Sequence, residues 1–270
     1  MAKVSSEAKR RYGDKIKEYR SKVDQMLQHE KSLLHIIESD EKGQGYKRLT
    51  LADENLNMVS YYLLMNHLSI SLLGIKNEGF LNNARKTCYK SIIYLEDVVS
   101  SVIDAPFSEY EKQLEEIADF TYQQRWDLLC KLGFTIEMLV DSYGSNSKWK
   151  WSFVELEGRF ATVSKNMLNL KEVLSKLDPR FDGYPVYVEH IKMVKRLLES
   201  AASNYRQKYE LSTSRLEDFK LAIRYLAALR RLHILLGESQ ESEVIKKKIE
   251  IWKSKMDADS KNREQSKKLK

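Results

Sequence analysis

Hydrophobic residues recur every three or four positions over long stretches of the chain, which is the spacing of one face of an α-helix. The first stretch predicts a helix over residues 5–39, because positions in steps of four and three fall on one seam. These positions are Tyr12, Ile16, Tyr19, Val23, Met26, Glu30, Leu33 and Ile37. Glu30 is the charged member, so the seam is either partly solvated or meets a basic partner there.

The same spacing predicts further helices over residues 51–73, 79–103, 108–143, 149–177, 185–205, 215–236 and 239–256. The most regular pattern runs from Trp149 to Leu177, where apolar residues step by four and three without interruption. Helix-breaking residues separate the predicted segments. They are Gly43 and Gly45, Asp104-Ala105-Pro106, Gly144-Ser145-Asn146-Ser147, and Asp178-Pro179.

The composition agrees with a fold made of helices. The 270 residues include only 10 glycines and 3 prolines, too few for the many tight turns of an all-β protein. Charged residues make up 31% of the chain, which suits helices with one solvated face. We therefore expect an all-α bundle of about seven to eight long amphipathic helices with heptad-type seams. We expect a separable N-terminal helix at 1–45, a helical bundle at 46–256 and a basic, disordered tail at 257–270.

One short stretch resembles a tetratricopeptide-type helical hairpin. Leu73-Gly74 is followed by Phe80, Ala84, Cys88 and Ser91, whose small members would let two helices approach closely. Leu235-Leu236-Gly237 resembles the end of another first helix. The closing proline of such repeats is missing, and no period of roughly 34 residues links the two places. The resemblance implies a tetratricopeptide-like helical array as the alternative fold, without a family assignment.

Features related to location and redox state point to a cytoplasmic protein. No stretch approaches the roughly 18 apolar residues that span a bilayer. Residues 1–24 are charged throughout and lack the apolar core of a secretory signal. Cys88 and Cys130 lie in apolar helical stretches, where two reduced thiols are expected, with a disulfide between helices as the alternative.

The sequence contains no recognisable catalytic, metal-binding or nucleotide-binding motif. His29 and His35 are six positions apart and lie on different helix faces, whereas zinc proteases need histidines four apart. The Glu-x-x-His motif of di-iron bundles does not occur. Cys130 has no identifiable basic partner to activate its thiol, and there is no Gly-rich phosphate loop. We expect no catalytic, metal-binding or cofactor-binding residues and no cofactor. An enzyme whose site is assembled from distant residues is the alternative.

Charge is unevenly distributed along the chain. Residues 91–141 hold 11 acidic against 3 basic residues, whereas residues 192–231 hold 10 basic against 4 acidic. The acidic and basic helices either pair inside one bundle or present faces that attract a partner of opposite charge. Nucleic acid is one such partner, bound by basic side chains with tyrosine rings available for stacking. The candidate residues are Arg215, Lys220, Arg224, Arg230, Arg231, Tyr205, Tyr209 and Tyr225.

A second candidate surface surrounds Trp151. Trp149 belongs to the predicted seam, so Trp151 should point elsewhere from the same turn, beside Lys148 and Lys150. An exposed tryptophan near lysines suits a hot spot for a partner; alternatively, Trp151 packs under the preceding Ser/Asn loop. We expect a non-enzymatic protein–protein interaction or scaffold protein, with an acidic protein partner or a homodimer. A nucleic-acid-binding protein is the alternative.

Overall fold

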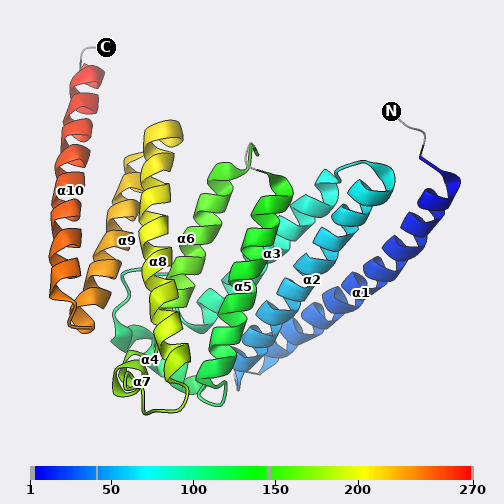
Figure 1. The fold of residues 1–270 in the computed structure, drawn as a ribbon, viewed down its shortest axis with the longest axis horizontal. Helices are drawn as coiled ribbons and strands as arrows, with labels where there is room; N and C mark the ends of the chain where they lie inside the picture. The colour runs from blue at the N-terminus through cyan, green and yellow to red at the C-terminus, as the bar shows by residue number, and fades with distance from the viewer. Residues whose placement is uncertain (1–3, 41, 145–146, 269–270) are drawn as a thin grey trace. The chain divides into compact units, whose positions relative to one another are not determined.

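We describe the fold from a computed structural model, which covers residues 4–40, 42–144 and 147–268, with side chains to Asn262. Within these residues the chain forms α-helices, one π-helical segment and no strand (Figure 1). The predicted all-α fold is confirmed. The elements are α1 Ser6–Ser39, α2 Gln44–Leu73, α3 Glu78–Val98, α4 Phe107–Glu116, α5 Tyr122–Tyr143, α6 Lys150–Asn166, α7 Leu170–Ser175, α8 Tyr184–Lys208, η1 Tyr209–Thr213, α9 Leu216–Leu235 and α10 Ser239–Lys268.

The helices divide into two compact units. Unit 1 comprises Met1–Ser101 and Glu111–Trp149, and unit 2 comprises Val102–Tyr110 and Lys150–Lys270. This division differs from the three parts expected from the sequence, since the N-terminal helix belongs with α2, α3 and α5. Whether that helix can separate from the rest stays a prediction.

In unit 1, α1 packs along α2 through the predicted seam. Ile16 and Val23 are buried against Met58, Met65 and Phe80, with tyrosines around them. Burying such side chains stabilises the pair by about 1.5–3 kcal/mol each. The residues buried on α1 therefore belong to the predicted heptad seam, and the other faces of the helix remain solvated.

The buried Glu30 meets a basic partner, which was one of the two alternatives for its place in the seam. Its carboxylate accepts hydrogen bonds from Lys90 Nζ at 2.7 Å, Tyr94 Oη at 2.8 Å and Asn55 Nδ2 at 3.1 Å. Burial raises the pKa of Glu30, but the bonds from Lys90, Tyr94 and Asn55 outweigh it, so the pKa lies below its usual value. Glu30 is 4% exposed and joins α1 to both α2 and α3.

In unit 2, α8 packs between α6 and α9, and α10 packs along α9. The approach of α6 to α8 requires the glycine at 158, since a Cβ there would lie 2.6 Å from the Tyr205 ring and 2.8 Å from Tyr225 Oη. The two tyrosine rings stack with centroids 5.6 Å apart. Gly158 thus provides the space in which both rings are buried.

The segment 102–110 precedes α6 by some 40 residues in the chain but belongs to unit 2. Lys165 of α6 donates to the carbonyls of Ile103, at 3.3 Å, and Ala105, at 2.9 Å. Burial, followed by the charge of Arg231, lowers the pKa of Lys165 to about 8. The segment is therefore fixed by carbonyl bonds to a largely buried ammonium group.

Two long predicted helices are each divided in the structure. The stretch 108–143 becomes α4 and α5, with a capping box of Thr121 and Gln124 at the start of α5. The continuous seam predicted over 149–177 is wrong, because the backbone leaves the helix at Met167–Asn169. Asn169 begins α7 by accepting a hydrogen bond from the Glu172 amide. The apolar spacing continues across the break because Met167 and Leu168 are themselves buried.

The last helix extends beyond its predicted end at residue 256. α10 reaches Lys268, so the stretch expected to be a disordered tail is helical as far as the structure describes it. Tyr209 Oη donates to Asp259 Oδ2 at 2.8 Å. Lys255 Nζ lies 3.6 Å from the same carboxylate. These polar contacts support the helix around Asp259, and the hydrophobic pattern alone could not indicate them.

Candidate functional site

A surface hollow of unit 1 lies between α2 and α5. The two helices run in the same direction there, since the first halves of α2 and α5 line one hollow and their second halves line another. Hollows of about 570 and 620 Å³ follow one another along the pair. We call this surface the α2–α5 groove. Its lining residues are Tyr46, Leu49, Thr50, Asp53, Glu54, Asn57, Ser60, Leu63, Leu64, Asn66, His67 and Ile70 of α2, Phe120 before α5, and Gln124, Asp127, Leu128, Lys131, Phe134, Thr135, Met138, Asp141 and Ser142 of α5.

The lining follows from helical periodicity. On each helix the lining positions are spaced by three and four residues, so they form one stripe facing the other helix. Other sides of α2 are covered by α1, against which Met58 and Met65 are buried, and by α3, whose Ser91 donates to the Ala52 carbonyl. The stripe toward α5 remains open because α5 approaches α2 less closely than α3 does.

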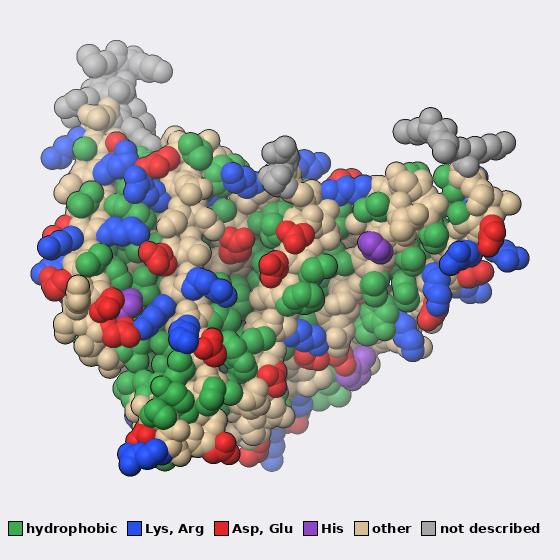
Figure 2. Space-filling view, viewed as in Figure 1, with side chains coloured by type: hydrophobic (Ala, Val, Ile, Leu, Met, Phe, Trp, Pro, Cys, Tyr) green, Lys and Arg blue, Asp and Glu red, His purple; other side chains and the backbone are tan. Residues whose placement is uncertain are grey.

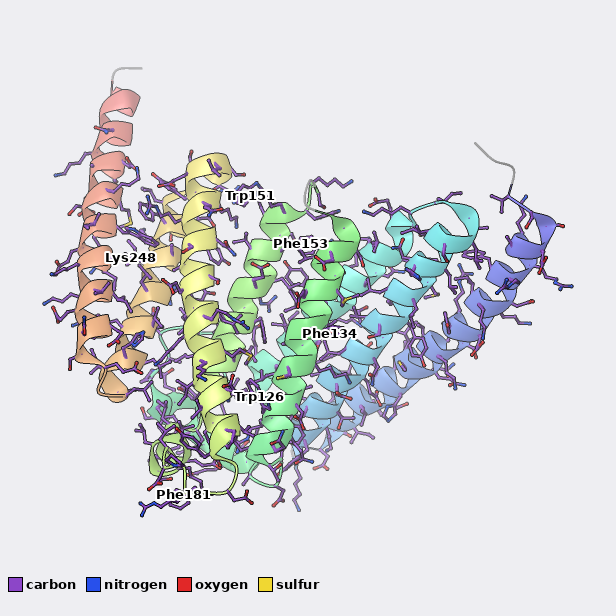
Figure 3. All side chains as sticks on the ribbon, in the orientation of Figure 1. Trp126, Phe134, Trp151, Phe153, Phe181 and Lys248 are labelled. Carbon is purple, nitrogen blue, oxygen red and sulfur yellow. The ribbon has the colours of Figure 1, made fainter. Side chains whose placement is uncertain are left out.

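Large hydrophobic side chains are exposed along the second half of the groove. Phe134 is 65% exposed, Ile70 45%, Leu64 44% and Met138 40%. Figure 3 shows Phe134 on the side of α5 that faces α2, and Figure 2 shows hydrophobic side chains at the surface over both helices. A contiguous exposed apolar patch rimmed by polar residues marks an interaction surface more often than single exposed residues do.

The groove is acidic. Four carboxylates, those of Asp53, Glu54, Asp127 and Asp141, line it together with one lysine. That lysine, Lys131, contacts Asp53 Oδ1 at 2.5 Å. Outside the lining, the ring of His29 on α1 lies 2.8 Å from Glu54. The excess of carboxylates favours a cationic partner, and it disfavours phosphate groups.

Neither cysteine offers a reactive thiolate. Burial raises the pKa of Cys88 to about 12. The pKa of Cys130 is also raised, first by burial and then by the charge of Asp127. Both are free thiols, Cys88 buried and Cys130 exposed. In the part of the chain that the structure describes, no group of three or more His, Cys, Asp and Glu residues could hold a metal ion.

The residues proposed from the sequence for nucleic-acid binding are largely engaged within unit 2. Arg224 Nε and Arg231 Nη2 both donate to the Asp104 carboxylate, the second at 3.0 Å. Tyr205 and Tyr209 are 4% and 5% exposed, so the expectation that their rings are available for stacking on bases is wrong. Arg230 is half-buried on the same helix.

Of the remaining candidates, the two basic side chains are exposed and the tyrosine is buried. Arg215 and Lys220 are exposed, and Lys220 pairs with Glu217 at 2.7 Å. Buried Tyr225 stacks on Tyr205. The tyrosine rings are therefore packed inside unit 2, whereas the side chains of Arg215 and Lys220 are exposed to solvent.

In the surface predicted around Trp151, the two lysines are exposed but the tryptophan is half-buried. Lys148 and Lys150 are exposed, and Trp151 is half-buried, with Lys150 Nζ 5.1 Å from the centre of its ring. Trp149 stacks under Arg85, whose guanidinium lies 4.0 Å from the indole centre. Residues 145–146 of the loop under which Trp151 was alternatively expected to pack lie outside the described residues.

The groove residues were not among the sequence-derived candidates, although a signal for them existed. Phe134 and Met138 are four apart and fall off the buried face of their helix, which carries Leu128, Leu132 and Leu139. Large apolar side chains on two faces of one helix indicate a second contact surface. The same reasoning applies to Leu64 on α2.

A scan of family models finds one that matches residues 8–260. The chain belongs to the TP0443 family. No match was found among curated proteins or solved structures. The family assignment does not confirm the resemblance to a tetratricopeptide hairpin, although α2 and α3 do form a close pair with Ala84, Cys88 and Ser91 buried. No helix within the described part of this TP0443-family chain is long and apolar enough to cross a membrane.

Proposed function

We propose that the chain is a non-enzymatic protein-interaction module whose α2–α5 groove binds an amphipathic helix of a protein partner. The observation that carries this proposal is the open apolar stripe between two parallel helices, centred on Phe134. An amphipathic helix that places its apolar face in such a groove is a recurring mode of peptide recognition.

The dimensions and chemistry of the groove support a helical ligand. From Tyr46 to Ile70 it follows α2 for about 36 Å, at 1.5 Å per residue. This length accommodates several turns, with anchors at i, i+3 or i+4, and i+7. Carboxylates lie along the same path, so the ligand helix should carry lysines or arginines beside its apolar face.

The nucleic-acid alternative receives less support. The acidic groove repels phosphates, and Arg224 and Arg231 share the carboxylate of Asp104. The tyrosines that would stack on bases are buried. We therefore take the protein partner as the proposal.

A model peptide tests the proposal directly. A fluorescein-labelled amphipathic helix of leucine and lysine is titrated with the full chain, and binding is followed by fluorescence anisotropy. A peptide with glutamate in place of lysine serves as the charge control. We expect binding of the lysine peptide that weakens as salt screens the carboxylates, and much weaker binding of the glutamate peptide.

The matched variants are Phe134→Asp in the groove and Phe181→Asp on unit 2, where Phe181 is 48% exposed. Covering the exposed two-thirds of Phe134 contributes about 1–2 kcal/mol, so Phe134→Asp should weaken binding about 5- to 30-fold. Phe181→Asp should leave it unchanged. Equal affinities of Phe134→Asp and the unaltered chain for the lysine peptide would refute the proposed groove.

A further inference from the structure

The last helix of the chain has two apolar faces, of which only one is covered. Ile245 and Trp252 are buried, at 9% and 4% exposure, where α10 meets its neighbours in unit 2. Val244 and Ile251 are 62% and 68% exposed. These two are seven positions apart, so they share one face about 10 Å apart along the axis. We call it the outer face of α10.

The outer face lies within a basic stretch of α10. Between residues 244 and 256 there are five lysines, at 246, 247, 248, 253 and 255, and one acidic residue, Glu250. Figure 2 shows Lys and Arg side chains over this helix, and Figure 3 labels Lys248. Lys247 is three positions after Val244 and four before Ile251, and Lys255 is four after Ile251, so these two exposed lysines border the outer face. Lys248 also borders it but contacts Glu199 of α8 at 3.8 Å, and Lys246 and Lys253 lie on the other side of the helix. The helix therefore presents aliphatic side chains with lysines beside them.

We propose that the outer face of α10 in one copy of the chain docks into the α2–α5 groove of a second copy. This inference rests on the proposed function and names its ligand. The α10 face has the chemistry that the groove calls for, since exposed aliphatics match the stripe around Phe134 and lysines match the groove carboxylates. Both surfaces are present at equal concentration in every solution of the protein.

The contact joins two different surfaces, so it is heterologous. Repetition of such a contact gives a closed ring or an open chain of copies. Association should therefore grow with concentration beyond a dimer, unless the ring closes at two. It should also weaken with added salt, because the interface combines lysines with carboxylates.

Two single variants of the full chain test the contact. Phe134→Asp replaces the central apolar side chain of the groove with a charge, and Ile251→Asp does the same on the outer face of α10. Both replaced side chains are largely exposed, so each variant should keep the far-UV circular dichroism and melting temperature of the unaltered chain. Sedimentation velocity from micromolar to sub-millimolar concentration should show association that either variant weakens at least tenfold, which corresponds to about 1.4 kcal/mol. Ile93→Asp, on the 43% exposed Ile93 of α3, is the matched control and should associate normally.

Mixing the two variants identifies the geometry. Phe134→Asp retains α10 and Ile251→Asp retains the groove, so the mixture has one productive contact. It should form a 1:1 heterodimer that stops at two copies. A mixture that stays monomeric, when each variant is folded, would overturn the inference.

Other outcomes separate the two proposals. Binding of the lysine peptide by a chain that remains monomeric at every concentration would overturn the second-copy inference and leave the proposed function standing. Loss of peptide binding as well would remove both. Association disrupted by Ile36→Asp on α1 but not by Ile251→Asp would place the contact on the first helix. Binding of α10 to phosphatidylglycerol vesicles without self-association would assign its outer face to an anionic lipid surface instead. Either of the last two outcomes, a contact on α1 or binding to lipid without self-association, would overturn the inference.

Discussion

Replacing Lys90 by methionine should destabilise unit 1 because it leaves Glu30 buried without its cation. Glu30 is 4% exposed and Lys90 Nζ lies 2.7 Å from its Oε2. Removing one partner of a buried pair typically costs 3–5 kcal/mol. The cost at pH 7 has a ceiling, because the variant can protonate Glu30 instead, which takes about 3.7 kcal/mol for a carboxyl of pKa near 4.3. Tyr94 and Asn55 still donate to Glu30, so we expect a loss of about 2–3 kcal/mol.

Urea unfolding followed by circular dichroism at 222 nm measures this loss. Lys86→Met on the same helix is the control, since Lys86 is exposed and its replacement should change the free energy of unfolding by less than about 0.5 kcal/mol. Glu30→Met should cost less than Lys90→Met, about 1–2 kcal/mol, because the half-exposed Lys90 can return to water while Tyr94 and Asn55 lose an acceptor.

The pH dependence gives a second criterion. In the unaltered chain the pKa of Glu30 is lowered, so its stabilisation is present above the unfolded pKa and is lost as pH falls through the folded pKa. In Lys90→Met the pKa should be raised, so that variant loses stability as pH rises above the unfolded value. The difference between the two proteins should therefore be largest near neutral pH and shrink toward pH 4. Equal stability of Lys90→Met and Lys86→Met, or a difference independent of pH, would refute this reasoning.

Two further predictions concern unit 2. Gly158→Ala places a Cβ 2.6 Å from the buried Tyr205 ring and should lower the free energy of unfolding by about 1–3 kcal/mol. Gly13→Ala is the control: its Cβ would have nothing within 4 Å, so it should be neutral or stabilising. Equal melting temperatures of the two variants would contradict the tight approach of α6 to α8. Asp104→Asn should cost about 0.5–1 kcal/mol at neutral pH, because Arg224 and Arg231 are half exposed. Burial raises the pKa of Asp104, but the two arginines lower it by more, so the pKa lies below its usual value. The stabilisation from this pairing is therefore lost as pH falls through the folded pKa. The stabilities of the two proteins should converge in acid, and a difference that stays constant with pH would contradict the pairing.

Local patterns predicted the helices well where one face alone is buried. The seam of α1 is buried at Ile16, Val23, Glu30 and Ile37, and a basic partner for Glu30 was one of two stated alternatives. The break after α6 was not predictable from spacing, since Met167 and Leu168 keep the apolar pattern while a neighbouring asparagine redirects the backbone. Helical spacing reports which residues are buried, and it does not report where the backbone turns.

The candidate site depended on information that a single sequence lacks. The pairing of Asp104 with Arg224 joins residues 120 positions apart, so the basic face of α9 could not be recognised as paired. The groove exists because α5 leaves one stripe of α2 uncovered, which is a property of tertiary packing. Phe134 and Met138 were visible as apolar residues off the main face, but their exposure follows only from the arrangement of the neighbouring helices.

The order of the two units along the chain has a consequence for how the protein is made and divided. Because Val102–Tyr110 belongs to unit 2 and Glu111–Trp149 to unit 1, no single cut yields two complete pieces. A fragment starting at residue 150 lacks the carbonyls that Lys165 binds and the carboxylate that Arg224 and Arg231 share. During synthesis, the nine residues from Val102 emerge before any of the helices that enclose them. Unit 2 can therefore be completed only after α10 has emerged, when unit 1 is already fully synthesised.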